Sequence, residues 1–326
     1  KWIVEQGYTL FVVSWVNPDN SYADVGMDNY VEDGYITAID QVKEITGEEK
    51  VNAIGYCIAG TTLSLTMALL EKRKRKDVNC ATLFTTLTDF SDPGEIGVFL
   101  NDGFIDGIEK EVTEQGYLDK FFMSRTFSYL RSNDLIYGPA IKSYMLGDAP
   151  PAFDLLYWNG DGTNLPARMA VEYLRGLCQN DQFATEGFSL CGETLKLSDI
   201  KVPVCSIACE TDHIAIPSGC YNGLQKFGSR SKTFILSESG HIAGIVNPPT
   251  KKKYGHYTND DMKTDFETWK ANATYNEGSW WPRWHTWLSK RSGKQVPARQ
   301  PGDASHPVIT AAPGTYVQKP KELEVA

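Results

Sequence analysis

The chain of 326 residues lacks any apolar run of about 18 residues, so its sequence predicts no transmembrane segment. No signal-peptide pattern opens the sequence, and we therefore expect a soluble protein of the cytoplasm. Basic residues are also in the minority, because 32 Lys and Arg stand against 41 Asp and Glu and leave a net charge of −9. Since nucleic-acid-binding domains usually present a basic surface, this balance argues against a nucleic-acid partner.

The cysteines fit neither a disulfide framework nor a metal centre. Seven is an odd number, and in a chain of this length it favours a reducing compartment. No C-x-x-C pair occurs, and Cys205 and Cys209 lie four positions apart in a β-rich run rather than at a zinc-knuckle spacing. We therefore expect no metal and no cofactor, and most of the thiols are interpreted as small apolar packing groups.

Apolar, β-rich runs alternate with helical patterns along the chain. The expected strands are Tyr8–Trp15, Val51–Tyr56, Cys80–Leu87, Lys201–Ala208 and Lys232–Leu236. Helices are expected from about Met27 to Ile45 and over Thr61–Leu70. Because the first strand is apolar throughout, and helices separate the strands, the pattern predicts a parallel α/β sheet covered on both faces.

One interval between strands is far longer than a crossover requires. Roughly 110 residues separate Leu87 from Lys201, whereas a βα connection needs few residues. The expected organisation is a first core segment over residues 1–88, an inserted cap over 89–199, a second core segment over 200–291 and an extended tail over 292–326.

The expected cap contains helical patterns over Asp119–Leu130 and Ala167–Leu177 and an aromatic loop, Phe153–Asn159. We favour a lid over an active site above a decorative insertion. The tail is rich in proline, alanine and glycine and has little periodicity, which is typical of an extended segment.

Cys57 lies where an apolar strand breaks into a turn before a helix, in the sequence VNAIGYCIAG. Strand, turn and helix in this order form a nucleophile elbow, here with sulfur in place of the usual serine oxygen. Gly55 and Ala59 flank Cys57 two positions away, where small side chains let the turn pack closely. The usual pattern has glycine at both positions, so Ala59 is a departure, although Gly60 follows at once. Cys57 is the candidate nucleophile, and a structural cysteine is the alternative.

Candidate partners follow two later strands. Asp212 comes after the Lys201–Ala208 run, and His241 comes after the Lys232–Leu236 run. The order nucleophile, acid, histidine is that of α/β-hydrolases. His213 is a rival base, but a chain neighbour of Asp212 would struggle to fold back between that acid and the nucleophile. The remaining histidines lie outside such contexts and are not expected to be catalytic: His256, His285 and His306.

A cysteine nucleophile suits the exchange of thioesters. A helix N-terminus and a neighbouring histidine promote thiolate formation, and the acyl-enzyme would be a thioester that still reacts with an alcohol. The N–H of Ile58, the residue after the nucleophile, is the candidate oxyanion-hole donor. The second donor normally comes from a loop after an earlier strand. We therefore expect this chain to be the carboxyl portion of a longer protein, without its first sheet strands.

Motifs throughout the chain resemble the catalytic domain of class I polyhydroxyalkanoate synthases. They are SWVNPD at 14–19, GYCIAG at 55–60, FDLLYWNGDGTNLP at 153–166, ETDHIA at 210–215, SGHIAGIVNPP at 239–249 and GSWWPRW at 278–284. The resemblance runs nearly from end to end and specifies far more than the elbow alone.

This resemblance implies polymerisation of (R)-3-hydroxyacyl-CoA, chiefly short-chain units such as 3-hydroxybutyryl-CoA, with release of CoA. On the matching motifs, Cys57 is the nucleophile that holds the growing polyester chain, His241 deprotonates it, and Asp212 orients His241 or assists the incoming hydroxyl. It further implies a capped site, a homodimer, residence on granules in the bacterial cytoplasm, and granule-associated proteins as partners.

Two other functions stay open at this stage. A cysteine-dependent hydrolase of the dienelactone-hydrolase type shares the elbow, and a catalytically silent granule-binding protein would carry a vestigial triad. The basic run Glu71–Lys76 is interpreted as a solvated helix end, which we favour over a site for CoA phosphates. Trp280, Trp281 and Trp284 are interpreted first as packing residues.

Overall fold

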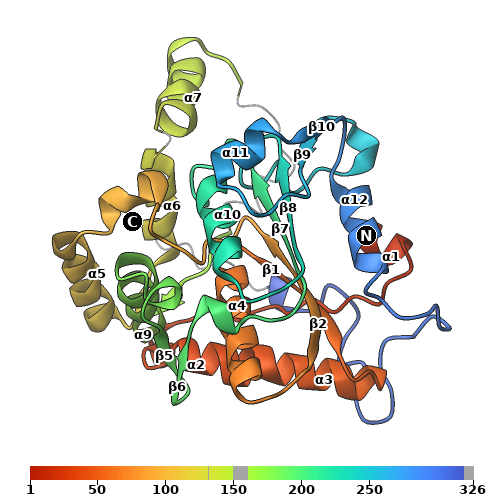
Figure 1. Ribbon diagram of the computed structural model, residues 1–326. Helices are drawn as coiled ribbons and strands as arrows, with labels where there is room; N and C mark the ends of the chain where they lie inside the picture. Colours follow the sequence, from red (N-terminus) through yellow and green to blue (C-terminus); the bar gives the residue numbers. More distant parts are fainter. Residues whose placement is uncertain (131, 150–160, 319–326) are drawn as a thin grey trace.

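A six-stranded sheet forms the centre of the molecule (Figure 1). The computed structural model describes residues 1–130, 132–149 and 161–318, so the aromatic loop expected at Phe153–Asn159 lies outside the described residues. The strand order is β1-β2-β7-β8-β9-β10. The first four run parallel: β1 Val51–Tyr56, β2 Val78–Phe84, β7 Val204–Cys209 and β8 Lys232–Ser237. The last two are short and antiparallel: β9 His256–Thr258 and β10 Thr274–Asn276. The predicted parallel α/β sheet is confirmed.

Helices cover both faces of the sheet because its central strands are apolar on both. All six residues of β7 are buried, which is typical of a central parallel strand. On one face lie α3 (Thr37–Thr46), α4 (Ile58–Lys72) and α10 (Pro217–Lys226), and on the other lies α12 (Trp281–Ser289) beside α1 (Trp2–Glu5) (Figure 1). The helix expected from Met27 is continuous through α2 (Met27–Asn29) and a π-helical stretch, Tyr30–Ile36, into α3.

Helix α4 is buried along most of its length, from Gly60 to Leu70. Four of the residues inside it carry hydroxyl groups, and each hydroxyl donates to a main-chain carbonyl: Thr61, Thr62, Ser64 and Thr66. Because buried polar groups destabilise a fold unless they are hydrogen-bonded, these bonds let the helix that follows Cys57 lie in the apolar interior.

The chain between β2 and β7 forms a separate group of helices beside the sheet. It contains α5 (Asp102–Gln115), α6 (Lys120–Leu130), α7 (Gly138–Ala140) and α9 (Ala167–Val171). In Figure 1, α5 and α6 lie to one side of the sheet and α7 projects from the body. A small apolar cluster of its own holds α5 to α9, so this stretch of the chain does not depend only on the main core.

The prediction of a strand over Tyr8–Trp15 is wrong. The segment has no regular structure, and Val12 and Val13 are 79% and 52% exposed. β-Propensity becomes a strand only when a neighbour accepts and donates the backbone hydrogen bonds, and this segment pairs with no strand that the structure describes. Trp15, at the end of the segment, contacts the body of the molecule, because its ring packs on Tyr30 and Tyr35.

The tail from residue 292 has no regular element in its described residues except a turn at Tyr316–Gln318. It nevertheless contacts the body, because the N–H of Asn17 donates to the Tyr316 hydroxyl at 2.8 Å and Arg299 donates to the carbonyl of Thr46. Within the described ranges, no helix has both the length and the apolar character that crossing a membrane requires.

Candidate active site

Cys57 occupies a strained turn between β1 and α4. Its backbone has φ 53° and ψ −125°, a left-handed conformation that a non-glycine residue adopts at a cost of about 1–3 kcal/mol. The N–H of Cys57 donates to the carbonyl of Phe84 in β2, and the N–H groups of Gly60 and Thr61 donate to the carbonyl of Cys57. The turn is therefore fixed on the strand side and on the helix side.

The close backbone approach in this turn joins Gly55 and Gly60. A Cβ on Gly55 would lie 2.5 Å from the Cα of Gly60, and a Cβ on Gly60 would lie 2.0 Å from Oγ1 of Thr86. Glycine is thus required at the third position after Cys57 rather than at the second. This spacing explains why Ala59 is compatible with the elbow.

Asp212 and His241 form a direct pair beside the turn. Nδ1 of His241 lies 2.7 Å from Oδ2 of Asp212, and Asp212 is 4% exposed. The other carboxylate oxygen accepts from the N–H groups of Ile214 and Ala215 at 2.9 and 3.0 Å. Since both oxygens have fixed donors, the carboxylate holds the imidazole in one orientation.

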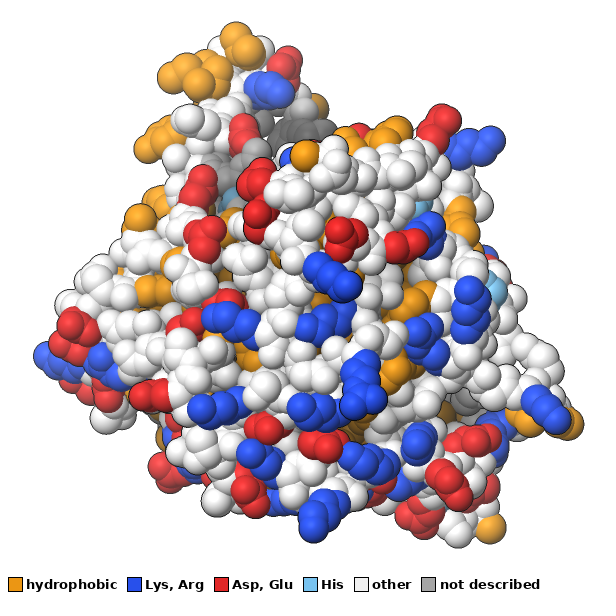
Figure 2. Space-filling model, in the orientation of Figure 1, with side chains coloured by type: hydrophobic (Ala, Val, Ile, Leu, Met, Phe, Trp, Pro, Cys, Tyr) orange, Lys and Arg blue, Asp and Glu red, His pale blue; other side chains and the backbone are white. Residues whose placement is uncertain are grey.

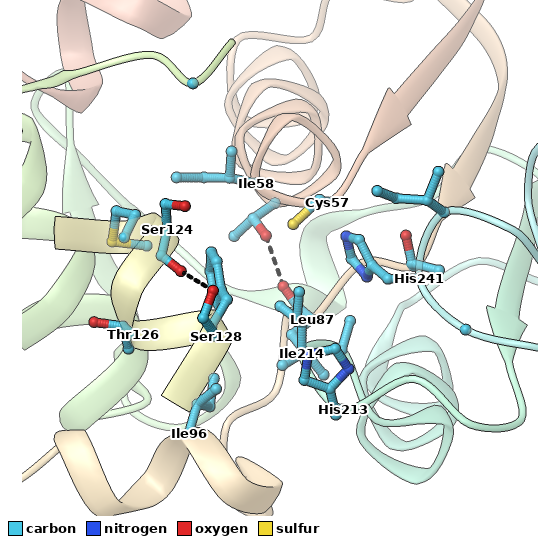
Figure 3. A pocket seen from close by; sticks show the side chains of 18 of the residues that line it. Cys57, Ile58, Leu87, Ile96, Ser124, Thr126, Ser128, His213, Ile214 and His241 are labelled. Carbon is cyan, nitrogen blue, oxygen red and sulfur yellow. Dashed lines mark hydrogen bonds between the residues drawn. The ribbon is translucent and has the colours of Figure 1, made fainter. Parts of the chain in front are cut away.

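His241 also lies beside Cys57 at the wall of the same cavity, so the acid, the histidine and the thiol follow one another in space (Figure 3). Burial of the imidazole opposes its protonation, but the hydrogen bond to Asp212 and the neighbouring Cys57 outweigh burial and raise the pKa of His241 to about 10. The ring therefore carries a proton across the neutral range.

Replacing Asp212 by asparagine is expected to move the pKa of His241 from about 10 back toward its ordinary 6.5, because the carboxylate is lost while burial remains. The raised pKa stabilises the folded state fully below pH 6.5, and this contribution is lost as the pH rises through 10. Side-chain ¹H–¹⁵N spectra across a pH series measure the titration. The His213→Gln variant is the control, and a wild-type His241 that titrates near 6.5 would contradict the prediction.

The other six cysteines differ from Cys57 in their surroundings. All seven are free thiols, but burial raises the pKa of each of the following: Cys80, Cys178, Cys191, Cys205, Cys209 and Cys220. Thiols of this kind are poor nucleophiles. Cys57 instead lies next to the protonated His241, at the wall of a cavity that Cys178 also lines.

A cavity of about 930 Å³ opens in front of Cys57 and His241. Strand-end loops form one wall, and two further residues there, Thr85 and Ser239, share the left-handed backbone conformation with φ of 42° and 74°. Figure 3 shows Cys57 and His241 together on this wall, with the side chains of α6 across the cavity. The opposite wall comes largely from the chain between β2 and β7 and is rich in apolar side chains: Ile96, Phe99, Phe104, Phe122, Met123 and Phe127.

The structure brings together all four residues selected from the sequence, because Ile58 also lines the cavity beside Cys57. His213 lines the same cavity, but the ring that bonds Oδ2 of Asp212 is that of His241. The other histidines lie elsewhere: His256 faces the carbonyl of Gly278, His285 packs against Trp2 and Tyr8, and His306 lies beside Asp303.

The basic run Glu71–Lys76 makes ion pairs away from the cavity. Arg73 pairs with Glu32, Arg75 with Asp77, and Lys72 with Asp199. These contacts are those of a solvated helix end.

The tryptophans of the GSWWPRW motif pack around the start of α12 against the sheet, where Nε1 of Trp284 donates to Oγ1 of Thr82, and the first two also hydrogen-bond the loop that carries His241. Nε1 of Trp280 donates to the carbonyl of Gly244, and Nε1 of Trp281 donates to the carbonyl of Ile245. Sequence reasoning missed this second role, because a tryptophan motif by itself signals only packing.

Comparison with known proteins adds a fold family and a set of relatives. Residues 3–248 match the family model described as the alpha/beta hydrolase fold. The chain is 43% identical over 97% of its length to the poly(3-hydroxyalkanoate) polymerase of Methylorubrum extorquens, and covers 52% of that protein. It is 40% identical over 98% of its length to poly(3-hydroxyalkanoate) polymerase subunit PhaC of Rhizobium etli, and covers 50% of it. It is 38% identical over 97% of its length to poly(3-hydroxyalkanoate) polymerase subunit PhaC of Cupriavidus necator, and covers 55% of it. The chain thus spans about half the length of the curated relatives it matches.

Proposed function

Because the chain belongs to the α/β-hydrolase fold family and is related to poly(3-hydroxyalkanoate) polymerases, we propose that it polymerises (R)-3-hydroxyacyl-CoA, chiefly 3-hydroxybutyryl-CoA, with release of CoA. The observation that carries this proposal is the arrangement of Asp212, His241 and Cys57, in which Asp212 bonds the imidazole and the imidazole lies beside Cys57 at the cavity wall. A hydrolase elbow that carries sulfur keeps the acyl group as a thioester, which suits transfer to an alcohol.

In the first proposed step, Cys57 has passed its proton to His241, and the resulting thiolate attacks the thioester carbonyl carbon of the acyl-CoA. The bond from that carbon to the CoA sulfur breaks, the acyl group stays on Cys57, and CoA leaves with the proton that His241 carries. The N–H of Ile58 donates to the oxyanion, since the first N–H groups of helix α4 have no intrahelical acceptor.

In the second proposed step, the 3-hydroxyl oxygen of another unit attacks the carbonyl carbon of the Cys57 thioester. His241 accepts the hydroxyl proton, an ester bond forms, and the bond to the Cys57 sulfur breaks. The thiolate and the protonated imidazole are then restored beside each other. Asp212 keeps Nδ1 of the ring occupied, so that the other ring nitrogen exchanges protons in both steps.

The chain between β2 and β7 would act as a lid in this reaction. Its aromatic and aliphatic side chains line the cavity opposite Cys57, and an apolar wall suits a polyester better than it suits water. Excluding water favours transfer of the acyl group over its hydrolysis. We assign this role to residues 89–199, the segment expected from the sequence to form a cap.

The relationship also suggests a homodimer at the surface of cytoplasmic polyester granules, beside granule-associated proteins. Figure 2 shows apolar side chains gathered over the projecting α7 region. Tyr144, Met145 and Leu146 in this region are 89%, 79% and 67% exposed. Such a patch is suited to contact with another apolar surface.

The product of the reaction tests the proposed function. The purified protein given 3-hydroxybutyryl-CoA is expected to release CoA and to form insoluble polyester, measured by thiol release and by the mass of the solid product. Butyryl-CoA is the matched control, because it lacks the 3-hydroxyl group and should acylate Cys57 once without polymer. Free 3-hydroxybutyrate as the sole acyl product would refute the polymerase and indicate a hydrolase of the dienelactone-hydrolase type.

A further inference from the structure

Tyr56, the last residue of β1, joins the strand of the nucleophile to the loop of the histidine. Its hydroxyl donates to the main-chain carbonyl of His241. Its ring stands edge-on to the imidazole, with the ring centroids 5.5 Å apart and an interplanar angle of 83°. Burial raises the pKa of the Tyr56 phenol well above its ordinary value, so the hydroxyl stays a donor over the whole working range.

The other contacts hold different stretches of the histidine loop. The carbonyl of Gly244 accepts from Ser237 Oγ at 2.9 Å and from Trp280 Nε1 at 2.8 Å, and Trp281 holds the carbonyl of Ile245. These bonds fix the loop beyond His241 in the chain. At His241 itself, Asp212 holds one nitrogen of the ring and Tyr56 holds the main chain.

One hydrogen bond at Nδ1 does not by itself fix the imidazole against Cys57, because the ring can pivot about that bond. A second contact at the backbone of the same residue, with an aromatic edge against the ring, removes this freedom. Both contacts come from the residue directly before Cys57, so a shift of the elbow moves the histidine with it.

We propose that Tyr56 is a positioning residue that sets His241 against Cys57 and so keeps the thiol and its base in register. For turnover this inference rests on the proposed polymerase function. For the reactivity of Cys57 toward a simple alkylating agent, the inference does not rest on the polymerase function, because that reaction needs only the thiol and the histidine.

Tyr35 offers a matched control. Its hydroxyl also donates to a main-chain carbonyl, that of Ala59 at 2.9 Å, and burial likewise raises the pKa of its phenol. The bond is of the same kind and lies on the helix side of the elbow, but it does not touch His241. Tyr35→Phe and Tyr56→Phe therefore remove equivalent bonds, and only the second loosens the histidine.

The test compares Tyr56→Phe with Tyr35→Phe in alkylation of Cys57 by iodoacetamide, followed by peptide mass spectrometry, and in polymerisation. Tyr56→Phe is expected to slow alkylation and to lower kcat by about tenfold with little change in KM, since small misplacements of reacting groups are costly. Tyr35→Phe should stay within about twofold of the wild type in both rates, while the two variants lower the unfolding temperature by similar amounts. In a His241→Gln background, Tyr56→Phe should cause no further loss, because it acts through the histidine.

Two results would overturn the inference. One is an alkylation rate for Tyr56→Phe within twofold of the wild type. The other is an equal loss of alkylation rate when Tyr56→Phe is introduced into the wild type and into the His241→Gln variant, which would mean that Tyr56 acts on the elbow directly. If the wild type forms no polyester while alkylation responds as described, the polymerase proposal fails and the positioning role stands.

Discussion

Replacing Cys57 by alanine is expected to lower CoA release from 3-hydroxybutyryl-CoA by about 10³-fold or more, because removal of a catalytic nucleophile leaves only binding and the oxyanion site. Cys57→Ser should also lose most of the activity, since a hydroxyl beside an already protonated histidine is a far weaker nucleophile than a thiolate. The initial rate of thiol release measures both effects, and the unfolding temperature checks that each variant is folded.

Cys191→Ala is the matched control for this experiment. Cys191 is also a free, partly exposed cysteine in a left-handed backbone conformation, with φ of 51°, but it lines a different pocket from that of Cys57. Its replacement should leave the rate unchanged. A Cys57→Ala variant that kept more than about a tenth of the wild-type rate would remove the covalent step from the mechanism.

Replacing Gly55 by alanine is expected to destabilise the protein by about 3 kcal/mol, at the upper end of the usual cost of overpacking. The added methyl group would meet backbone atoms of Gly60 at 2.5 and 2.8 Å, and backbone, unlike the end of a flexible side chain, yields little. Urea denaturation measures the loss in free energy of unfolding. The displaced elbow should also slow the alkylation of Cys57.

Gly107 in α5 provides the contrast for this substitution. A Cβ there would meet nothing within 4 Å, and the residue is exposed within a helix. Gly107→Ala is therefore expected to stabilise the protein by about 0.5–1 kcal/mol, because alanine favours the helical conformation. Equal effects of the two substitutions would contradict the steric account of the elbow.

The elements of the fold that sequence predicted well are those that local pattern determines. The elbow is marked by β1, Cys57 and α4 in one continuous stretch, and the acid and the histidine each follow an apolar strand directly. The strands β9 and β10 went unpredicted because each has three residues and polar side chains. The prediction of a strand over Tyr8–Trp15 failed for the opposite reason, since the composition of this segment favours a strand but no described strand pairs with it.

The arrangement around the histidine was harder to foresee because it depends on residues far apart in the chain. Tyr56 and His241 are separated by 185 positions, and nothing in the sequence near either residue signals the hydrogen bond between them. The spacing of Gly55 and Gly60 was visible in the sequence, but which atoms approach became clear only from the backbone geometry.

The pairing of β2 with β7 has a consequence for how this protein can change. These strands are parallel neighbours, so the long segment between them leaves the sheet at the carboxyl end of β2 and re-enters it at the opposite edge, at the amino end of β7. Parts of the segment between β2 and β7 can be exchanged, lengthened or shortened while the hydrogen-bond register of the sheet stays the same. Replacing this segment by that of a relative is thus a direct route to altering the cavity wall opposite Cys57, with the elbow and its histidine left untouched.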